Sequence, residues 1–220
     1  MRRFVPEKAK VIPQNATRVF QGEIFNVYQW RQEMFDGTTR TFEMLKRSDT
    51  VEIMTLLGPE EQDCLVRSWQ VNGMPDERMP DLSIREPRIL ITHQIQPCQD
   101  WFYAYPGGRV DGDDADELKA AKRELKEETG VICEGWKLLE AHQPFAKADW
   151  LVYTFLATGL KGVDKLELDG GEKIKLLLLS FDELRDYAKK PNAKFLWPAW
   201  LDRMSSFKEL MDLPGIFNYN

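Results

Sequence analysis

The chain has 220 residues, a formal net charge of −6 and an apolar fraction of 43%, with 7 Trp, 6 Tyr and 12 Phe. This composition is too apolar and too aromatic for a disordered chain. The negative charge, without any basic block, argues against a nucleic-acid partner, and no apolar run approaches the ~18 residues of a membrane span. The basic N-terminus has no apolar segment behind it, so we expect no signal peptide. Three widely spaced cysteines predict a reducing compartment, the cytoplasm, without a disulfide framework or zinc site.

The N-terminal part of the chain predicts an arm built from β-strands. Segment 19–33 has partial alternation and strong β-formers, and a second run of this kind follows at 38–46. The Asp36-Gly37 pair between them is typical of a hairpin turn. We therefore expect an N-terminal arm and β-hairpin over residues 1–47.

The remaining residues, 48–220, predict one catalytic domain in which strands predominate. Further strand candidates follow at residues 51–57, 88–96, 131–139, 151–157 and 174–180. A helix is expected over 114–129, ending at Gly130, and one or two more follow late in the chain. Residues 58–87 are irregular, so we expect an insertion or long loop there, with at most a small element at 64–69. This order of elements favours the α+β class, a mixed sheet covered by helices.

The most informative segment is the predicted helix that follows the glycine turn at Gly107 and Gly108. At ~100° per residue, Glu124, Glu127 and Glu128 share one face of this helix. Three carboxylates near a helix C-terminus repel one another and meet the negative end of the helix dipole. Such a face needs a cation, and clustered carboxylate oxygens suit Mg²⁺ or Mn²⁺.

The competing interpretation is a surface helix that is merely rich in Glu and Lys. Lys119, Lys122 and Lys126, however, form a stripe of their own that faces water. The charges are therefore segregated instead of interleaved for i,i+4 pairing, and only Arg123, one turn before Glu127, is a cation near the acidic face. Glycines also let a backbone carbonyl approach a metal or phosphate closely. The pattern favours a metal–diphosphate site.

These residues resemble the signature of the Nudix hydrolase family, G-x5-E-x7-R-E-U-x-E-E-x-G-U, where U is aliphatic. Gly108 matches the first glycine, and residues 123–131 match the second half without a mismatch. The chain departs from the pattern twice. The spacing from Gly108 to Arg123 is one residue longer, and Asp113 or Asp114 replaces the glutamate of the first half.

A wider resemblance is to the ADP-ribose pyrophosphatase-like branch of that family. The segments that carry it are 19–25, 42–47, 90–97, 101–108, 151–159 and 174–184. The resemblance implies a Nudix-like α/β/α sandwich with a mixed β-sheet and an N-terminal β-arm. It also implies a homodimer, in which arm residues 19–46 contribute to the partner's pocket. Segment 58–87 stands out as an extra part.

The resemblance further implies an activity. A Nudix pyrophosphatase hydrolyses the diphosphate of a nucleoside diphosphate linked to another moiety. For this branch we expect ADP-ribose or a nucleotide sugar as the substrate, with a nucleoside monophosphate and a sugar phosphate as products. The alternatives are a hydrolase of modified nucleoside triphosphates and a non-catalytic nucleotide-binding module, which would be expected to have lost the box carboxylates.

Carried over by position, the resemblance implies metal ligands at Glu124, Glu127, Glu128 and the backbone carbonyl of Gly107. Two of these, Glu127 and Glu128, are also expected to act in catalysis. Arg123 would orient the helix glutamates through charge-assisted hydrogen bonds.

A further acid is expected from the loop before the last strand. Glu172 is the first candidate for a general base or extra ligand, ahead of Asp169 and Glu167. A loop without any chemical role is an equally open interpretation of this segment.

Substrate binding is expected from five residues near these motifs. Arg47 and Arg109 could bind phosphate, and Gly108 allows a phosphate to approach the backbone. Gln96 stands where the branch often has an arginine near the substrate. Phe25 could stack on a nucleobase. Three other aromatic residues share that candidacy: Trp30, Trp101 and Phe102.

Overall fold

The computed structural model describes residues 3–72, 80–168, 170–195 and 200–219. The strands are β1 (Thr17–Gln21), β2 (Asn26–Glu33), β3 (Thr39–Lys46), β4 (Thr50–Leu57), β5 (Arg88–Ile95), β6 (Phe102–Ala104), β7 (Gly107–Arg109), β8 (Val131–His142), β9 (Ala148–Asp149), β10 (Val152–Val163), β11 (Lys173–Leu179) and β12 (Phe217–Tyr219). The helices are α1 (Pro59–Asn72), α2 (Glu117–Thr129), α3 (Phe181–Ala188) and α4 (Lys208–Asp212), with a 3₁₀ turn, η1, at Leu201–Arg203. No helix in these described ranges has the length and apolarity that crossing a membrane requires.

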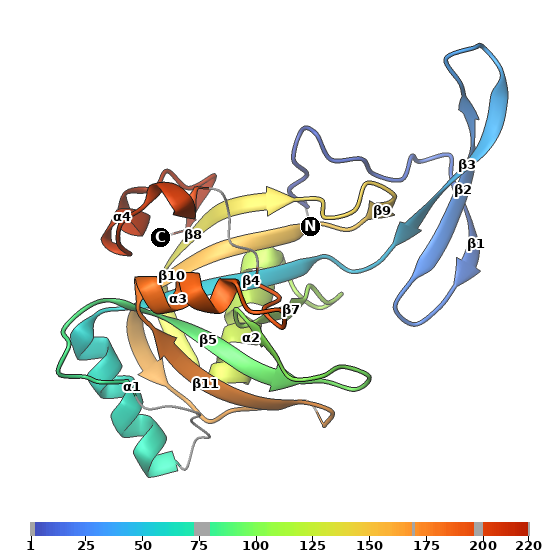
Figure 1. Cartoon of the computed structure of the whole chain (residues 1–220). Helices are drawn as coiled ribbons and strands as arrows, with labels where there is room; N and C mark the ends of the chain where they lie inside the picture. The colour runs from blue at the N-terminus through green and yellow to red at the C-terminus, as the bar shows by residue number, and fades with distance from the viewer. Residues whose placement is uncertain (1–2, 73–79, 169, 196–199, 220) are drawn as a thin grey trace.

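The arm is a four-stranded sheet in the order β1-β2-β3-β9, and it projects from the rest of the chain (Figure 1). The hairpin predicted at Asp36-Gly37 is confirmed, since β2 and β3 pair antiparallel around it and Gly37 has a φ of 78°. The segment predicted as one strand over 19–33 is instead a second hairpin. It turns at Gly22, whose N–H donates to Phe25 O at 3.0 Å. A Cβ at Gly22 would lie 2.9 Å from that oxygen, so this tight turn requires glycine.

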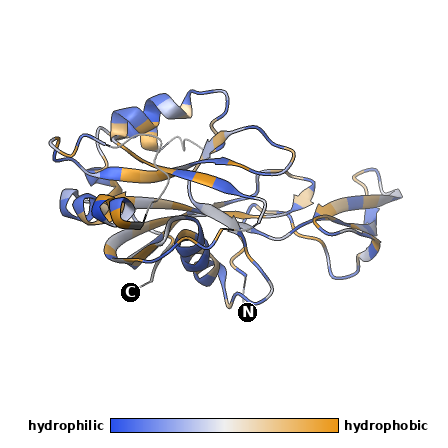
Figure 2. Ribbon diagram, turned by 90° about the horizontal axis from the view of Figure 1, so that it is seen from below, coloured by the Kyte–Doolittle hydropathy of each residue, from blue (hydrophilic) through white to orange (hydrophobic). Residues whose placement is uncertain are grey.

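The large sheet is mixed, and its main path runs β11-β5-β4-β10-β8-β12. The central strand β4 is parallel to β10 and antiparallel to β5. Helices α1 and α2 contribute to the apolar core on one face of this sheet. Helix α3 and the segment after it, which includes Phe207 and Leu210, cover the other face. The expected three-layer α/β/α sandwich is thus confirmed, and hydrophobic residues recur along the strands of its middle layer (Figure 2).

The expected loop over residues 58–87 was wrong in its first half. Helix α1 covers Pro59–Asn72, fourteen residues instead of a small element at 64–69. It buries Leu65, Val66 and Trp69. Three apolar anchors among many polar residues give only a weak helical period, which explains why the sequence pattern concealed this helix. Residues 73–79 lie outside the described ranges.

Two strands, β7 and β5, pair with different parts of the same edge of β4. The glycine turn pairs with its beginning, where Glu52 faces Gly107 through β7. Strand β5 pairs with its end, from Thr55 to Leu57. Between them, the N–H of Ile53 donates to Pro106 O at 2.8 Å. The register of β4 therefore fixes the glycine turn in front of α2.

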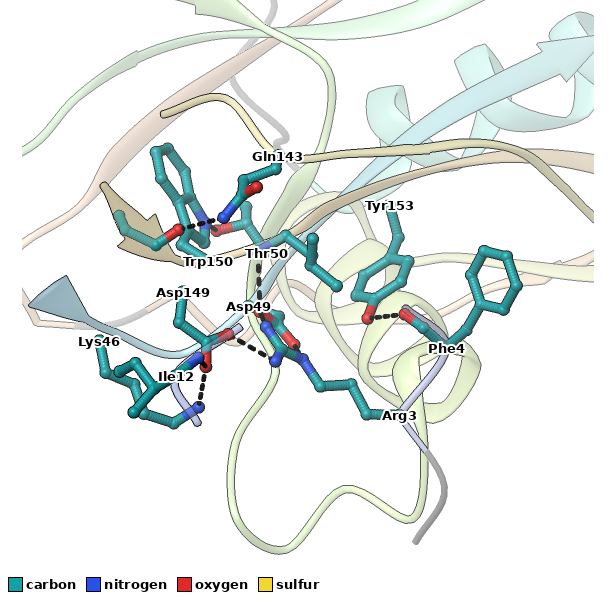
Figure 3. A network of polar contacts seen from close by, with 12 residues as sticks. Arg3, Phe4, Ile12, Lys46, Asp49, Thr50, Gln143, Asp149, Trp150 and Tyr153 are labelled. Atoms are coloured by element: carbon teal, nitrogen blue, oxygen red, sulfur yellow. Dashed lines mark hydrogen bonds and ion pairs between the residues drawn. The ribbon is translucent and has the colours of Figure 1, made fainter. Parts of the chain in front are cut away.

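The chain near the N-terminus is fastened where the arm meets the sandwich (Figure 3). Arg3 contacts the Asp49 carboxylate at 2.5 Å through Nε and the Asp149 carboxylate at 2.6 Å through Nη1. Lys46 also contacts Asp149, at 3.2 Å. The hydroxyl of Tyr153 donates to Phe4 O at 2.8 Å. This cluster links the N-terminal segment to the last residue of β3, to Asp49 just before β4, and to strands β9 and β10.

Candidate active site

Helix α2 carries the acidic face; it ends before Gly130 as predicted, but it begins at Glu117 and not at residue 114. Asp116 caps the start by accepting a hydrogen bond from the N–H of Lys119 at 2.8 Å. Gly130 ends the helix in the left-handed conformation with a φ of 71°, and its N–H donates to Lys126 O. The face with Ala121 and Leu125 is fully buried against the sheet. Packing and caps thus fix which way the remaining faces of the helix point.

Two of the three glutamates lie directly against the glycine turn. Glu128 is 4% exposed, and its Oε2 accepts a hydrogen bond from the N–H of Gly107 at 2.8 Å. The carboxyl carbon of Glu124 lies only 2.5 Å from where a Cβ of Gly108 would be. Gly107 has a φ of +155°, and a Cβ there would lie 2.1 Å from Val51 O. Gly107 therefore leaves room for the Val51 carbonyl, and Gly108 leaves room for the Glu124 carboxyl group.

Ionisation of Glu124 and Glu128 is unfavourable, because both carboxyl groups are largely shielded from water. Burial raises the pKa of Glu124 to about 7, although the nearby Arg123 works in the opposite direction. Burial also raises the pKa of Glu128 well above its ordinary value, against the hydrogen bond from Gly107. The negative charges of Glu124, Glu172 and Glu127 add to this effect. A cation at this face would relieve that cost.

Arg123 contacts the acidic face of α2. Its Nη1 contacts Glu124 at 2.9 Å and Glu127 at 3.0 Å. Its Nη2 contacts Asp114 at 2.8 Å and donates to Arg109 O at 2.9 Å. Arg123 thus contacts two of the three glutamates that share this face.

The aspartate that takes the place of the signature's first glutamate is Asp114. It is buried, it is paired with Arg123, and it accepts a hydrogen bond from the N–H of Asp111. Asp113 instead offers only its backbone oxygen, which accepts from Lys119 Nζ. The extra residue in the loop therefore still delivers a carboxylate to Arg123.

The donors around the glycine turn fit a hard divalent cation by their chemistry. Glu124, Glu127, Glu128 and the carbonyl of Gly107 supply only oxygen, the ligand type that Mg²⁺ and Mn²⁺ prefer. In the described ranges, no three His, Cys, Asp or Glu side chains are already grouped for a metal. The glutamates have other partners: Arg123 contacts Glu124 and Glu127, and Glu128 accepts a hydrogen bond from the N–H of Gly107.

A further acid joins these glutamates from the loop before β11. Glu172 accepts a hydrogen bond from Gln96 Nε2 at 3.0 Å, and it is close enough to raise the pKa of Glu128. The structure therefore brings two of the predicted site residues, Gln96 and Glu172, together beside Glu128. The side chain of the alternative, Glu167, is exposed, although its N–H donates to Glu127 O. Asp169 lies outside the described residues.

The predicted phosphate-binding residues gather at the base of the arm. The Arg47 guanidinium lies 4.4 Å from the ring centroid of Trp150 and 5.9 Å from that of Phe25. Burial lowers the pKa of Arg47, and the positive charge of Arg109 lowers it further. Two neighbouring arginines form a site suited to an anion. Thr50 accepts the indole N–H of Trp150 at 2.9 Å.

Trp150 is a candidate that the sequence analysis missed. The available signal was a tryptophan directly before the apolar strand segment 151–157. The other aromatic candidates pack elsewhere: Trp30 against Phe42, and Trp101 against His93. Phe102 is buried.

Comparison with known proteins agrees with this geometry. A family model described as NUDIX domain matches residues 82–199, more than half of the chain. The structure described as "Crystal structure of ADP compounds hydrolase" is similar in fold, with a TM-score of 0.57 and 17% sequence identity. That alignment covers 81% of this chain and 83% of the other. No curated protein matches the sequence significantly. From the family match and the site described above, the chain belongs to the Nudix family of hydrolases.

Proposed function

We propose that the protein is a metal-dependent pyrophosphatase that acts on ADP-ribose or a related nucleotide sugar. The observation that carries this proposal is the pair of carboxylates, the partly buried Glu124 and the buried Glu128, seated against Gly108 and Gly107. Family membership supports hydrolysis of nucleoside diphosphates linked to another moiety. The products would be a nucleoside monophosphate and a sugar phosphate, released when water replaces the bridging oxygen at one phosphorus.

The proposed roles follow from where the side chains lie. Arg47 and Arg109 bind phosphate oxygens. Phe25 and Trp150, on either side of Arg47, offer apolar surface to a nucleobase or sugar. Gln96 holds Glu172, so the latter can accept the proton of the attacking water.

The metal requirement rests on the acidic face. A bound divalent cation neutralises diphosphate charge and lowers the pKa of a bound water. Glu124, Glu127, Glu128 and the Gly107 carbonyl would hold it, while Arg123 keeps the glutamates oriented through its paired hydrogen bonds.

The direct test is hydrolysis of a substrate panel with Mg²⁺, with Mn²⁺ and with EDTA. We expect turnover of ADP-ribose or ADP-glucose, and its loss in EDTA. Preference for oxidised nucleoside triphosphates would instead support the alternative, a hydrolase of modified nucleoside triphosphates. Tight nucleotide binding without turnover under any metal would identify a non-catalytic module. Activity that EDTA leaves unchanged would contradict the proposed metal dependence.

Replacing Gly108 with alanine should reduce activity about tenfold or more while the fold persists. The new Cβ would displace the Glu124 carboxyl, which is the movable end of a side chain, so stability should change little. A misplaced metal ligand, however, slows the chemistry. The matched control is Gly112→Ala in the turn that follows β7, where a Cβ meets nothing within 4 Å. Equal rates for both variants and the wild type would argue against Glu124 as a ligand.

We further propose a cytoplasmic homodimer that forms through the arm of residues 1–47. Supporting this, the arm exposes several large apolar side chains: Val19, Phe20, Ile24, Phe25 and Phe35. An apolar surface of this kind marks an interaction site. Light scattering should give twice the chain mass of 25.7 kDa, and a monomeric mass would contradict the dimer.

A further inference from the structure

A concave site lies on the side of α2 opposite to its acidic face. It is open to solvent and has a volume of about 480 Å³, within the usual range for small-ligand sites. Lys122 and Lys126 of α2 line it together with Lys161 of β10, and Val131, Ile132 and Trp136 of β8 supply apolar surface. Cys133 and Glu134 complete the lining, and we call this site the lysine pocket.

The charge of the lysine pocket is opposite to that of the whole chain. Three lysines and one acid, Glu134, line the pocket, whereas the chain carries a net charge of −6. Lys126 also pairs with Asp164 at 3.1 Å. Lys122 and Lys161 are exposed, and Lys122 Nζ lies 5.8 Å from the ring centroid of Trp136. The pocket therefore presents positive charge beside an aromatic ring.

The apolar part of the lysine pocket is fixed and chemically inert. Trp136 is only 4% exposed, and its indole N–H is satisfied by Cys133 O at 3.0 Å. The apolar side chain that the pocket exposes is Ile132, at 37%. Burial raises the pKa of the Cys133 thiol to about 12, so this lining residue is not a nucleophile. The pocket is therefore suited to binding a ligand, not to covalent chemistry.

We propose that the lysine pocket binds a phosphate monoester that carries an aromatic ring, as a mononucleotide does. The ammonium groups would bind the phosphate through charge-assisted hydrogen bonds. The ring of the ligand would pack against Ile132, which is 37% exposed, and against the aliphatic parts of the lysine side chains, above the nearly buried Trp136. This site is separate from the acidic face, and its existence does not rest on the function proposed above.

The test follows the indole N–H signal of Trp136 by NMR, assigned with Trp136→Phe, while AMP is added in EDTA. We expect a saturable shift of this signal, binding that weakens with added salt, and little effect of adenosine or inorganic phosphate alone. Lys122→Gln combined with Lys161→Gln should weaken AMP binding about tenfold or more. Both changes are at exposed side chains, so the fold should persist.

Lys119→Gln is the matched control. Lys119 belongs to the same helical stripe, but its Nζ donates to Asp113 O outside the lysine pocket, so AMP should bind this variant as it binds the wild type. The proposal is overturned if AMP gives no saturable shift at Trp136, or if the double variant binds it equally well. Adenosine binding as tightly as AMP would likewise overturn the role of the phosphate.

Discussion

Changing Glu127 and Glu128 together to glutamine should slow hydrolysis by about a hundred- to ten-thousandfold. The substitution keeps the shape of both side chains and removes only their charge. The amide oxygen of Glu128→Gln can still accept the hydrogen bond from the N–H of Gly107. A loss of activity would therefore report the missing carboxylates and not a displaced glycine turn. The measurement is the turnover rate at saturating Mg²⁺ with the best substrate of the panel.

Two further observations make this experiment decisive. The double variant should be no less stable than the wild type without metal, since it removes a buried acid whose pKa is raised by burial. Mg²⁺ should raise the melting temperature of the wild type but not of the variant. The control Glu7→Gln changes an exposed acid of the N-terminal segment and should leave the rate unaltered. Full activity in the double variant would refute the proposed site.

Replacing Arg3 with methionine should destabilise the protein by about 2 to 3 kcal/mol, after allowance for its partial exposure. The Arg3 side chain is 27% exposed, but Asp149 is only 5% exposed. Removal of the Arg3 guanidinium leaves two neighbouring carboxylates, Asp49 and Asp149, with less positive charge to offset theirs. We expect a lower urea midpoint with an unchanged slope. Lys46→Met is the matched control, because the Lys46 side chain is 42% exposed, and it should cost less than about 1 kcal/mol.

The Arg3 effect should also depend on pH. Burial tends to raise the pKa of Asp149, but the hydrogen bond and charge of Arg3 outweigh burial and hold that pKa below 3.8. A depressed folded-state pKa contributes stability above the unfolded pKa, and that contribution is lost as the pH falls through the folded value. The difference between wild type and Arg3→Met should therefore be full at pH 6 and shrink below about pH 4. A difference that stays constant would mean that Arg3 acts through packing alone.

The features predicted well from sequence are those set by neighbours along the chain. The cap at Gly130, the grouping of three glutamates on one face and the turn at Asp36-Gly37 all follow from local periodicity and turn chemistry. The meeting of Arg123 with Glu127 is likewise a contact one helical turn apart. Such patterns constrain the structure before any tertiary packing is known.

The features that sequence reasoning missed depend on contacts between distant segments. Helix α1 is stabilised by burial of few side chains against a sheet, so its own pattern is weak. Arg3 contacts Asp49 and Asp149, which are 46 and 146 residues away. Trp150 becomes interesting only because Arg47 lies over its ring. None of these pairings leaves a signature in a single sequence.

Because β7 and β5 pair with the same edge of β4, an error in the register of β4 would affect both the active site and the sheet. Glu52 pairs with Gly107, and Ile53 holds Pro106, on the same strand whose far end aligns β5. A shift of β4 by one residue would exchange the side chains that face its two apolar cores and carry the glycine turn away from Glu124 and the rest of α2. Misaligned yet compact forms would thus be inactive, and recovered turnover during refolding should report that the innermost strands have locked into their native alignment.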